Sequence, residues 1–324
     1  MDLATTEEAS ASELQRQLRS GAFVVTAELT PPVSSDPTEF IDRALALRGL
    51  VTAVNVTDGA GARSHMSSLA AAHFLVKNGI EPILQLTCRD RNRIALQGEL
   101  LGAAALGIRN VLALRGDDPK TGDQPDTKAV FDLDTTGLLA MAHRMRSEGR
   151  LPTGTQIKGR VDLVLGAAEI PVDPPADWRP DGLKAKLEAG ADFIQTQGIY
   201  DMGLFREQMA KIRNMGLHEK TAILAGIIVP KSAMMLKYMD SSVAGVSVPK
   251  ELIDRMNKAK AAAGEDKKKM KELQEQEGIK ITIELIHQAL ETPGVRGVHI
   301  QAIEWESAIE GIVKAAGLYP RPQV

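Results

Sequence analysis

The chain has little cysteine and no long apolar run. Its single cysteine, Cys88, allows no disulfide within the chain and excludes a metal site built from two to four thiolates. No apolar run approaches the roughly 20 residues that a membrane-spanning helix needs. We therefore expect neither a membrane span nor a cysteine-bound metal.

Strong charge of either sign is also missing. The formal net charge is −3 and the pI is about 6.1. A nucleic-acid partner would need a clustered basic face, so none is expected. The first 21 residues lack the basic and apolar regions of a signal peptide, and we expect a cytoplasmic protein.

Short apolar runs alternate with amphipathic stretches along the chain. Apolar residues make up 44% of the 324 residues and charged residues 25%, as in a globular protein with a substantial core. Helix-like stretches cover 38–49, 67–79 and 91–107, and the last two end in a glycine just before the next strand, a common signal for the end of a helix. Eight runs have the length and composition of strands: FVVTAEL (23–29), AVNVTD (53–58), PILQLTC (82–88), NVLALRGD (110–117), VDLVLGAA (161–168), DFIQTQ (192–197), TAILAGIIV (221–229) and VRGVHIQAI (295–303).

This alternation predicts an α/β fold with parallel strands. Strands that are apolar throughout suit a sheet covered by helices, and eight repeats favour a closed (β/α)₈ TIM barrel over an open doubly wound sheet, the alternative. We predict a single barrel domain over residues 1–324. It has an N-terminal helical extension (1–20), which would cover the bottom of the barrel, and a helical insertion (249–290) before the last strand.

The insertion carries a charged run over residues 258–277. Such a run is typical of a solvated helical hairpin, and the alternative is a surface that binds a partner protein.

Polar residues gather where the predicted strands end. The carboxyl ends of barrel strands face the active-site mouth, so these side chains are the candidates for chemistry. They are Glu28 and Thr30; Thr57 and Asp58; Gln85 and Thr87; Arg115, Gly116, Asp117 and Asp118; Gln195 and Gln197; and His299, Gln301 and Glu304.

Glu28 stands in an apolar strand, where a lone carboxylate is costly unless it is paired or neutral. Burial raises the pKa of a carboxyl group, which suits a general acid. The alternative is a structural carboxylate that bridges the first and last strands.

Three further patterns each have two interpretations. The pair Asp117 and Asp118 is either a divalent metal site or loop capping, and neighbouring strands offer no further metal ligands. Gln195 and Gln197 share one strand face, where their amides either bind a planar heterocycle or bond within the barrel. Cys88 is either a nucleophile beside an arginine or a small buried hydrophobe.

At these same residues the sequence resembles the methylenetetrahydrofolate reductase family. The resemblance runs from about residue 21 to the C-terminus, and its several motifs occur in the family's order. They are TAELTPP (26–32), VNVTDGAGARS (54–64), QLTCRDRN (85–92), LALRGDDP (112–119), LKAKLEAGADFIQTQGIYD (183–201) and AGIIVPKSA (225–233). Three segments, VFDLD (130–134), GIIVPKSA (226–233) and VHIQAIEWE (298–306), most resemble a branch of stand-alone reductases of anaerobes and the reductase half of fused homocysteine methyltransferases.

The resemblance implies a flavoprotein of one-carbon metabolism. Such an enzyme reduces 5,10-methylenetetrahydrofolate to 5-methyltetrahydrofolate with FAD or FMN, and NADH or NADPH is the usual electron donor. Reductant and folate use one flavin face in turn, which implies ping-pong kinetics.

The resemblance also implies roles for single residues. Glu28 matches the acid that protonates the folate, so that the methylene bridge opens to a reactive iminium. Asp117 matches a carboxylate near the flavin that also contacts the pterin, and Gln197 matches the folate-binding glutamine, with Gln195 beside it. The positions that match flavin contacts are Thr57, Gln85, Arg115, Gly116, Asp117 and Lys186.

At three places the sequence differs from the better-known bacterial members of the family, and these differences concern the binding of the flavin and the identity of the electron donor. Gln85 stands where a histidine is common, GAAEIPVDPP (166–175) replaces the fifth-strand motif, and no nicotinamide-stacking aromatic lies near Ala233. Two alternative functions therefore stay open. One is a flavin-free folate oxidoreductase. The other is a folate-binding subunit that receives electrons from a partner subunit. A homo-oligomer is also compatible with the sequence.

Overall fold

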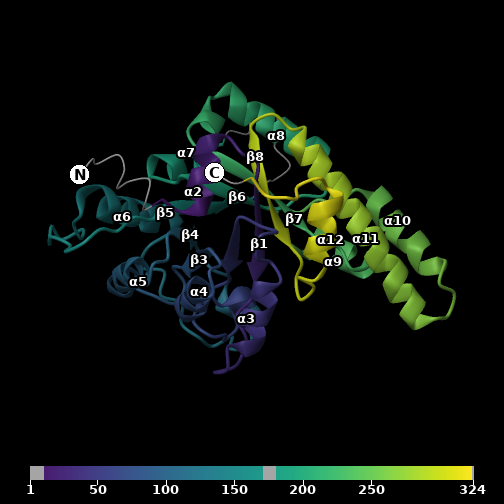
Figure 1. Ribbon diagram of the computed structural model, residues 1–324, viewed down its shortest axis with the longest axis horizontal. Helices are drawn as coiled ribbons and strands as arrows, with labels where there is room; N and C mark the ends of the chain where they lie inside the picture. Colours follow the sequence, from purple (N-terminus) through teal and green to yellow (C-terminus); the bar gives the residue numbers. More distant parts are fainter. Residues whose placement is uncertain (1–10, 171–179, 323–324) are drawn as a thin grey trace.

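The computed structural model describes residues 11–170 and 180–322. It is a closed barrel of eight parallel strands, each paired with its neighbours in chain order, and β1 pairs with β8. The predicted TIM barrel is confirmed over the open sheet (Figure 1). The strands are β1 (Val24–Leu29), β2 (Ala53–Val56), β3 (Pro82–Thr87), β4 (Asn110–Leu114), β5 (Val164–Glu169), β6 (Phe193–Gly198), β7 (Ala222–Ile228) and β8 (Val295–Gln301).

Helices surround the barrel, and several begin at a side chain that caps their free backbone N–H groups. Asn92 accepts from the N–H groups of Ile94 and Ala95 at the start of α5, and Asp134 accepts from Gly137 in the first turn of α6. The helices are α2 (Glu13–Ser20), α3 (Thr38–Leu45), α4 (Ser68–Lys77), α5 (Arg93–Ala105), α6 (Thr135–Glu148), α7 (Asp181–Glu188), α8 (Met202–Asn214), α9 (Ala233–Ser242), α10 (Lys250–Ala261), α11 (Lys267–Leu290) and α12 (Ala308–Ala315). Short 3₁₀ turns are η1 (Ala60–Ala62), η2 (Pro119–Thr121) and η3 (Leu217–Glu219).

The core has two layers, because each strand buries both faces. A large cluster of apolar side chains lies between the strands and the helices, and a smaller one fills the lower interior of the barrel. Leu14 of α2 is fully buried in the inner cluster, together with Val24, Phe193 and Leu224. The predicted N-terminal helix is therefore present over Glu13–Ser20 and covers the bottom of the barrel, whereas residues 1–10 lie outside the described part.

The predicted helical insertion is also confirmed. Three helices, α9, α10 and α11, separate β7 from β8, and α11 contacts both strands as well as α12. α10 packs against α11, and together they extend away from the barrel at the right of Figure 1. Arg255 of α10 binds Glu277 of α11 at 2.8 Å and Glu284 at 2.5 Å, so part of the hairpin's charge is paired internally.

Several strand boundaries differ from the sequence expectation, by at most three residues; β4, for example, ends at Leu114 and not at residue 117. β5 begins at Val164, three residues after the expected start, because Leu163 donates its backbone N–H to Val161 in a tight local turn. Among the described residues, no helix is both long and apolar enough to cross a membrane.

Candidate active site

A cavity of about 460 Å³ opens at the carboxyl ends of the strands. This size suits a small organic ligand. Its walls bring together side chains from six of the strands, β1, β3, β4, β5, β6 and β8, and from the loops that follow β2, β4 and β5. The sequence-predicted candidates that line it are Glu28, Thr57, Asp58, Gln85, Thr87, Arg115, Gly116, Asp117, Gln195, Gln197, His299 and Gln301. Thr30, Asp118 and Glu304 do not line it.

Glu28 lies near the end of β1 with its carboxylate in this cavity. Gln85 Nε2 on β3 donates a hydrogen bond to Glu28 Oε2 at 2.8 Å. His299 Nε2 on β8 lies 3.6 Å from the same oxygen, too far for a hydrogen bond. The side chain of Glu28 is 22% exposed, so the carboxylate is held on one side and accessible from the cavity.

Beneath Glu28, a network of polar side chains crosses the barrel interior. Gln195 and Asn55 bond reciprocally, with amide contacts of 2.7 and 3.1 Å between β6 and β2. Gln195 Nε2 also donates to Thr26 Oγ1 at 3.1 Å, and Thr26 Oγ1 lies 2.9 Å from His299 Nδ1. All four residues are buried, so each of these bonds satisfies a group that water does not reach.

The two glutamines of β6 therefore differ. The amide of Gln195 is already bonded within the barrel, and a ligand would have to displace those bonds. Gln197 Oε1 accepts only from the N–H of Gly198 at 3.2 Å, and its amide nitrogen has no partner among the described residues. Gln197 is the member of the pair with a donor free for a ligand in the cavity.

The carboxylates after β2 and β4 tie the mouth loops together. Asp117 Oδ2 accepts from the N–H of Gly61 at 2.9 Å, and Asp118 caps η2 through the N–H of Lys120 at 3.0 Å. Asp58 accepts from both the N–H and the hydroxyl of Thr87 at 2.9 Å and pairs with Arg91 at 2.7 Å. Within the described ranges, no three His, Cys, Asp or Glu side chains are grouped to hold a metal ion.

Three residues in the loops after β2 and β4 are candidates for a cofactor contact. Thr57 is 3% exposed, and its Oγ1 has no hydrogen-bond partner in the described chain. Gly116 has a left-handed backbone (φ 89°), and a Cβ there would come within 2.9 Å of Arg89 Cβ. The guanidinium of Arg115 stacks on Phe131 at 4.4 Å from the ring centroid. The unbonded hydroxyl of Thr57 and the guanidinium of Arg115 on this wall are groups that could hold a flavin, whereas Gly116 is required by its close packing against Arg89.

Lys186, the remaining cofactor residue of the sequence analysis, is not in the cavity wall. Its Nζ donates to Ala168 O at 2.7 Å and to the Glu169 carboxylate at 2.6 Å. Glu169 itself lines the cavity, so this lysine reaches the site only through a carboxylate that neutralises it.

Sequence reasoning did not single out Glu169, Thr26 or Asn55. Each is a polar residue within an apolar strand, the same signal that drew attention to Glu28.

Cys88 follows β3 and is fully buried. Burial raises the pKa of its thiol to about 11, with a smaller contribution from the charge of Asp134. The environment is that of a small buried hydrophobe, and the thiol is not poised as a nucleophile.

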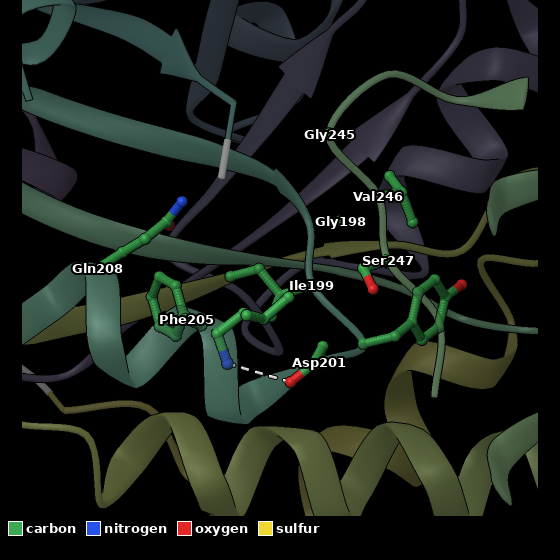
Figure 2. A pocket seen from close by; sticks show the side chains of 10 residues that line it. Gly198, Ile199, Asp201, Phe205, Gln208, Gly245, Val246 and Ser247 are labelled. Atoms are coloured by element: carbon green, nitrogen blue, oxygen red, sulfur yellow. Dashed lines mark hydrogen bonds between the residues drawn. The ribbon is translucent and has the colours of Figure 1, made fainter. Parts of the chain in front are cut away.

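A second cavity, of about 270 Å³, lies between the start of α8 and the segment 245–247 (Figure 2). Ile199, Phe205 and Val246 give it a mainly apolar wall, and Asp201 caps α8 through the N–H groups of Gly203 and Leu204. It shares no lining residue with the cavity around Glu28, so it does not extend that site.

The closed barrel and the polar cavity at the carboxyl ends of its strands define a (β/α)₈-barrel protein with its site in the position that barrel enzymes use. The sequence profile described as methylenetetrahydrofolate reductase matches residues 13–317. The chain therefore belongs to the methylenetetrahydrofolate reductase family.

Curated relatives of low sequence identity agree with this assignment. Methylenetetrahydrofolate reductase 2 of Schizosaccharomyces pombe is 28% identical over 80% of this chain and 39% of its own length. Methylenetetrahydrofolate reductase (NADH) 1 of Arabidopsis thaliana is 26% identical over 94% of this chain and 50% of its length. The chain thus spans about two fifths to one half of these relatives.

Among solved structures, an uncharacterised protein from Clostridium thermocellum has the same fold. It aligns with a TM-score of 0.57 and 15% identity, over 94% of this chain and 98% of its own. That protein is described as binding two copies of 5-methyl-5,6,7,8-tetrahydrofolic acid.

Proposed function

We infer that the chain reduces 5,10-methylenetetrahydrofolate to 5-methyltetrahydrofolate with a flavin. The observation that carries this proposal is Glu28, held by Gln85 at 2.8 Å inside a ligand-sized cavity, in a chain of this family. The folate-binding protein of the same fold is consistent with a folate in such a barrel. The motifs over 130–134 and 298–306 support the branch with stand-alone reductases and fused methyltransferases.

The first task of the site is to protonate the folate. Opening the methylene bridge breaks one carbon–nitrogen bond, and the departing nitrogen takes a proton while the carbon becomes an iminium with the other nitrogen. Asp58, Asp117 and Glu169 also line the cavity, but Asp58 pairs with Arg91 and Glu169 with Lys186. We assign the proton transfer to Glu28, whose carboxylate is held by an uncharged amide and is accessible from the cavity. Gln85 fixes one of its oxygens and leaves the other for the substrate.

Two further side chains orient the substrate. The unbonded amide nitrogen of Gln197 donates to the pterin, and Asp117, anchored to Gly61, accepts from the pterin N–H groups. Thr57, Arg115 and Gly116 would hold the flavin, which when bound and reduced would supply the hydride for the iminium carbon.

A second candidate function is a flavin-free folate oxidoreductase. It is favoured by the contact of 2.6 Å between Lys186 Nζ and the Glu169 carboxylate. A lysine whose charge is already paired in this way is less able to hold a flavin phosphate. The folate-binding subunit is the third candidate, with the α10–α11 hairpin as its contact to a partner. In each case we propose a cytoplasmic setting.

The proposal is tested by the visible absorbance of the purified chain. FMN or FAD is added, and then 5-methyltetrahydrofolate without oxygen. We expect a bound flavin whose absorbance bleaches as the folate is oxidised. Oxidation without flavin supports the second candidate, and a chain that binds folate with neither flavin binding nor oxidation supports the third.

A further inference from the structure

Two adjoining cavities form a trough at the end of the barrel opposite the candidate active site. Their volumes are about 350 and 360 Å³, and they share Gln15, Arg19, Val164 and Asp192. The walls come from α2, η3 and the amino ends of β5 to β8, and Figure 1 shows α2 at the end from which the strands start. We call this the basal trough.

Cationic side chains outnumber carboxylates in the basal trough. Five arginines and lysines line it, against three carboxylates. Two of those carboxylates already form ion pairs with arginines. Asp192 binds Arg146 at 2.5 Å and the N–H of Leu165 at 2.8 Å, and Asp162 binds Arg160 at 3.0 Å.

The remaining cations are not neutralised. Arg19, Lys220 and Arg296 have no ion-pair partner among residues 11–170 and 180–322, and Glu219, the third carboxylate, is exposed and also unpaired. Arg296 uses one donor on the carbonyl of Leu18 at 2.9 Å, which fixes the guanidinium in the wall and leaves its other N–H groups available.

Buried polar atoms without partners lie in the same wall. Thr221 is 6% exposed and lines the basal trough, and its Oγ1 makes no hydrogen bond within the described chain. The Nδ1 of His218, its neighbour in the wall, is also buried and unbonded. Such atoms cost free energy unless a ligand or water satisfies them.

We propose that the basal trough is a second ligand site, which binds a small anion carrying two phosphate groups. Guanidinium groups match phosphate oxygens with paired N–H donors, and the lysine adds a point charge. The volume of each cavity suits a small molecule. Because Arg19 belongs to α2 and Arg296 to β8, such a ligand would clamp the N-terminal helix to the strands.

Inorganic pyrophosphate is the probe, and its binding to the full chain is measured by calorimetry and by thermal unfolding. We expect one site per chain, a rise in Tm, and weaker binding as the salt concentration rises. The double variant Arg19→Ala, Lys220→Ala should weaken pyrophosphate binding by about ten-fold or more, since each substitution removes a charged donor. Thr221→Val keeps the side-chain shape and should weaken it several-fold.

Two control variants locate the site. Lys250→Ala removes an exposed lysine of α10 and should leave binding unchanged, and so should Arg115→Ala in the cavity around Glu28. Absence of pyrophosphate binding overturns the proposal. The proposal is also overturned if Arg115→Ala abolishes pyrophosphate binding and the Arg19→Ala, Lys220→Ala variant still binds pyrophosphate. Neither result tests folate reduction, which is measured separately.

Discussion

The amide of Gln85 on β3 donates to the carboxylate of Glu28 on β1, across β2, at 2.8 Å. The donor is uncharged, so it orients the carboxyl group without adding a formal charge beside it. A histidine is common at this position in the better-known bacterial members that the sequence resembles, and the structure shows glutamine in direct contact with the proposed acid.

Replacement of Gln85 by leucine should slow the folate half-reaction. Loss of one hydrogen bond to a charged group costs about 1.5 kcal/mol or more, which corresponds to a rate loss of about ten-fold. Gln85→His restores a donor and should recover much of the rate, a rescue that a purely structural role would not give. Stopped-flow absorbance checks the rates, with Gln276→Leu on the exposed face of α11 as the unaffected control.

Cys88 should resist alkylation in the folded protein. With the pKa of the thiol raised to about 11, roughly one molecule in a thousand carries the thiolate at pH 8, and the side chain is fully buried. Iodoacetamide labelling followed by mass spectrometry should therefore give an unlabelled native chain and a singly labelled chain in urea. Rapid labelling of the native chain would show that the thiol is accessible and reactive.

Gly278→Ala should destabilise the protein. A Cβ at Gly278 on α11 would overlap the carbonyl oxygen of Pro230, which follows β7, so the helix must shift away from the barrel. Overpacking of this kind costs about 1–3 kcal/mol of unfolding free energy.

The matched control for that variant is Gly311→Ala on α12, where a Cβ would meet nothing within 4 Å. It should be neutral or stabilise by up to about 1 kcal/mol, because alanine favours helix. Urea unfolding measures both variants. Equal stability of the two would show that the contact of α11 with Pro230 is not tight.

Much of the architecture could be predicted because it depends on local pattern. Eight apolar runs separated by helical stretches are sufficient for a barrel, and strand ends then bring Glu28, Asp117 and Gln197 into one cavity. The contacts across the barrel could not be predicted. Whether Gln195 faces a ligand or bonds to Asn55 depends on how β2 and β6 oppose one another after the barrel closes.

The pairing of Lys186 with Glu169 could not be predicted from the sequence for a similar reason. The two residues are 17 positions apart, on α7 and β5, and their contact depends on how that helix lies against the barrel. The resemblance to a family implies a role for Lys186, but the packed structure is needed to show that its ammonium group binds the Glu169 carboxylate.

Delivery of the proton to the folate is the role that we propose for Glu28. The most direct measurement compares the two half-reactions of Glu28→Gln and wild type, with Glu39→Gln on the exposed face of α3 as control. We predict that flavin binding and flavin reduction by the electron donor are nearly unchanged in Glu28→Gln. Oxidation of the reduced flavin by methylenetetrahydrofolate should fall by about 10²–10⁴-fold, the usual loss when a general acid is removed. Equal loss of both half-reactions, or a wild-type rate with the folate, would contradict the role assigned to Glu28.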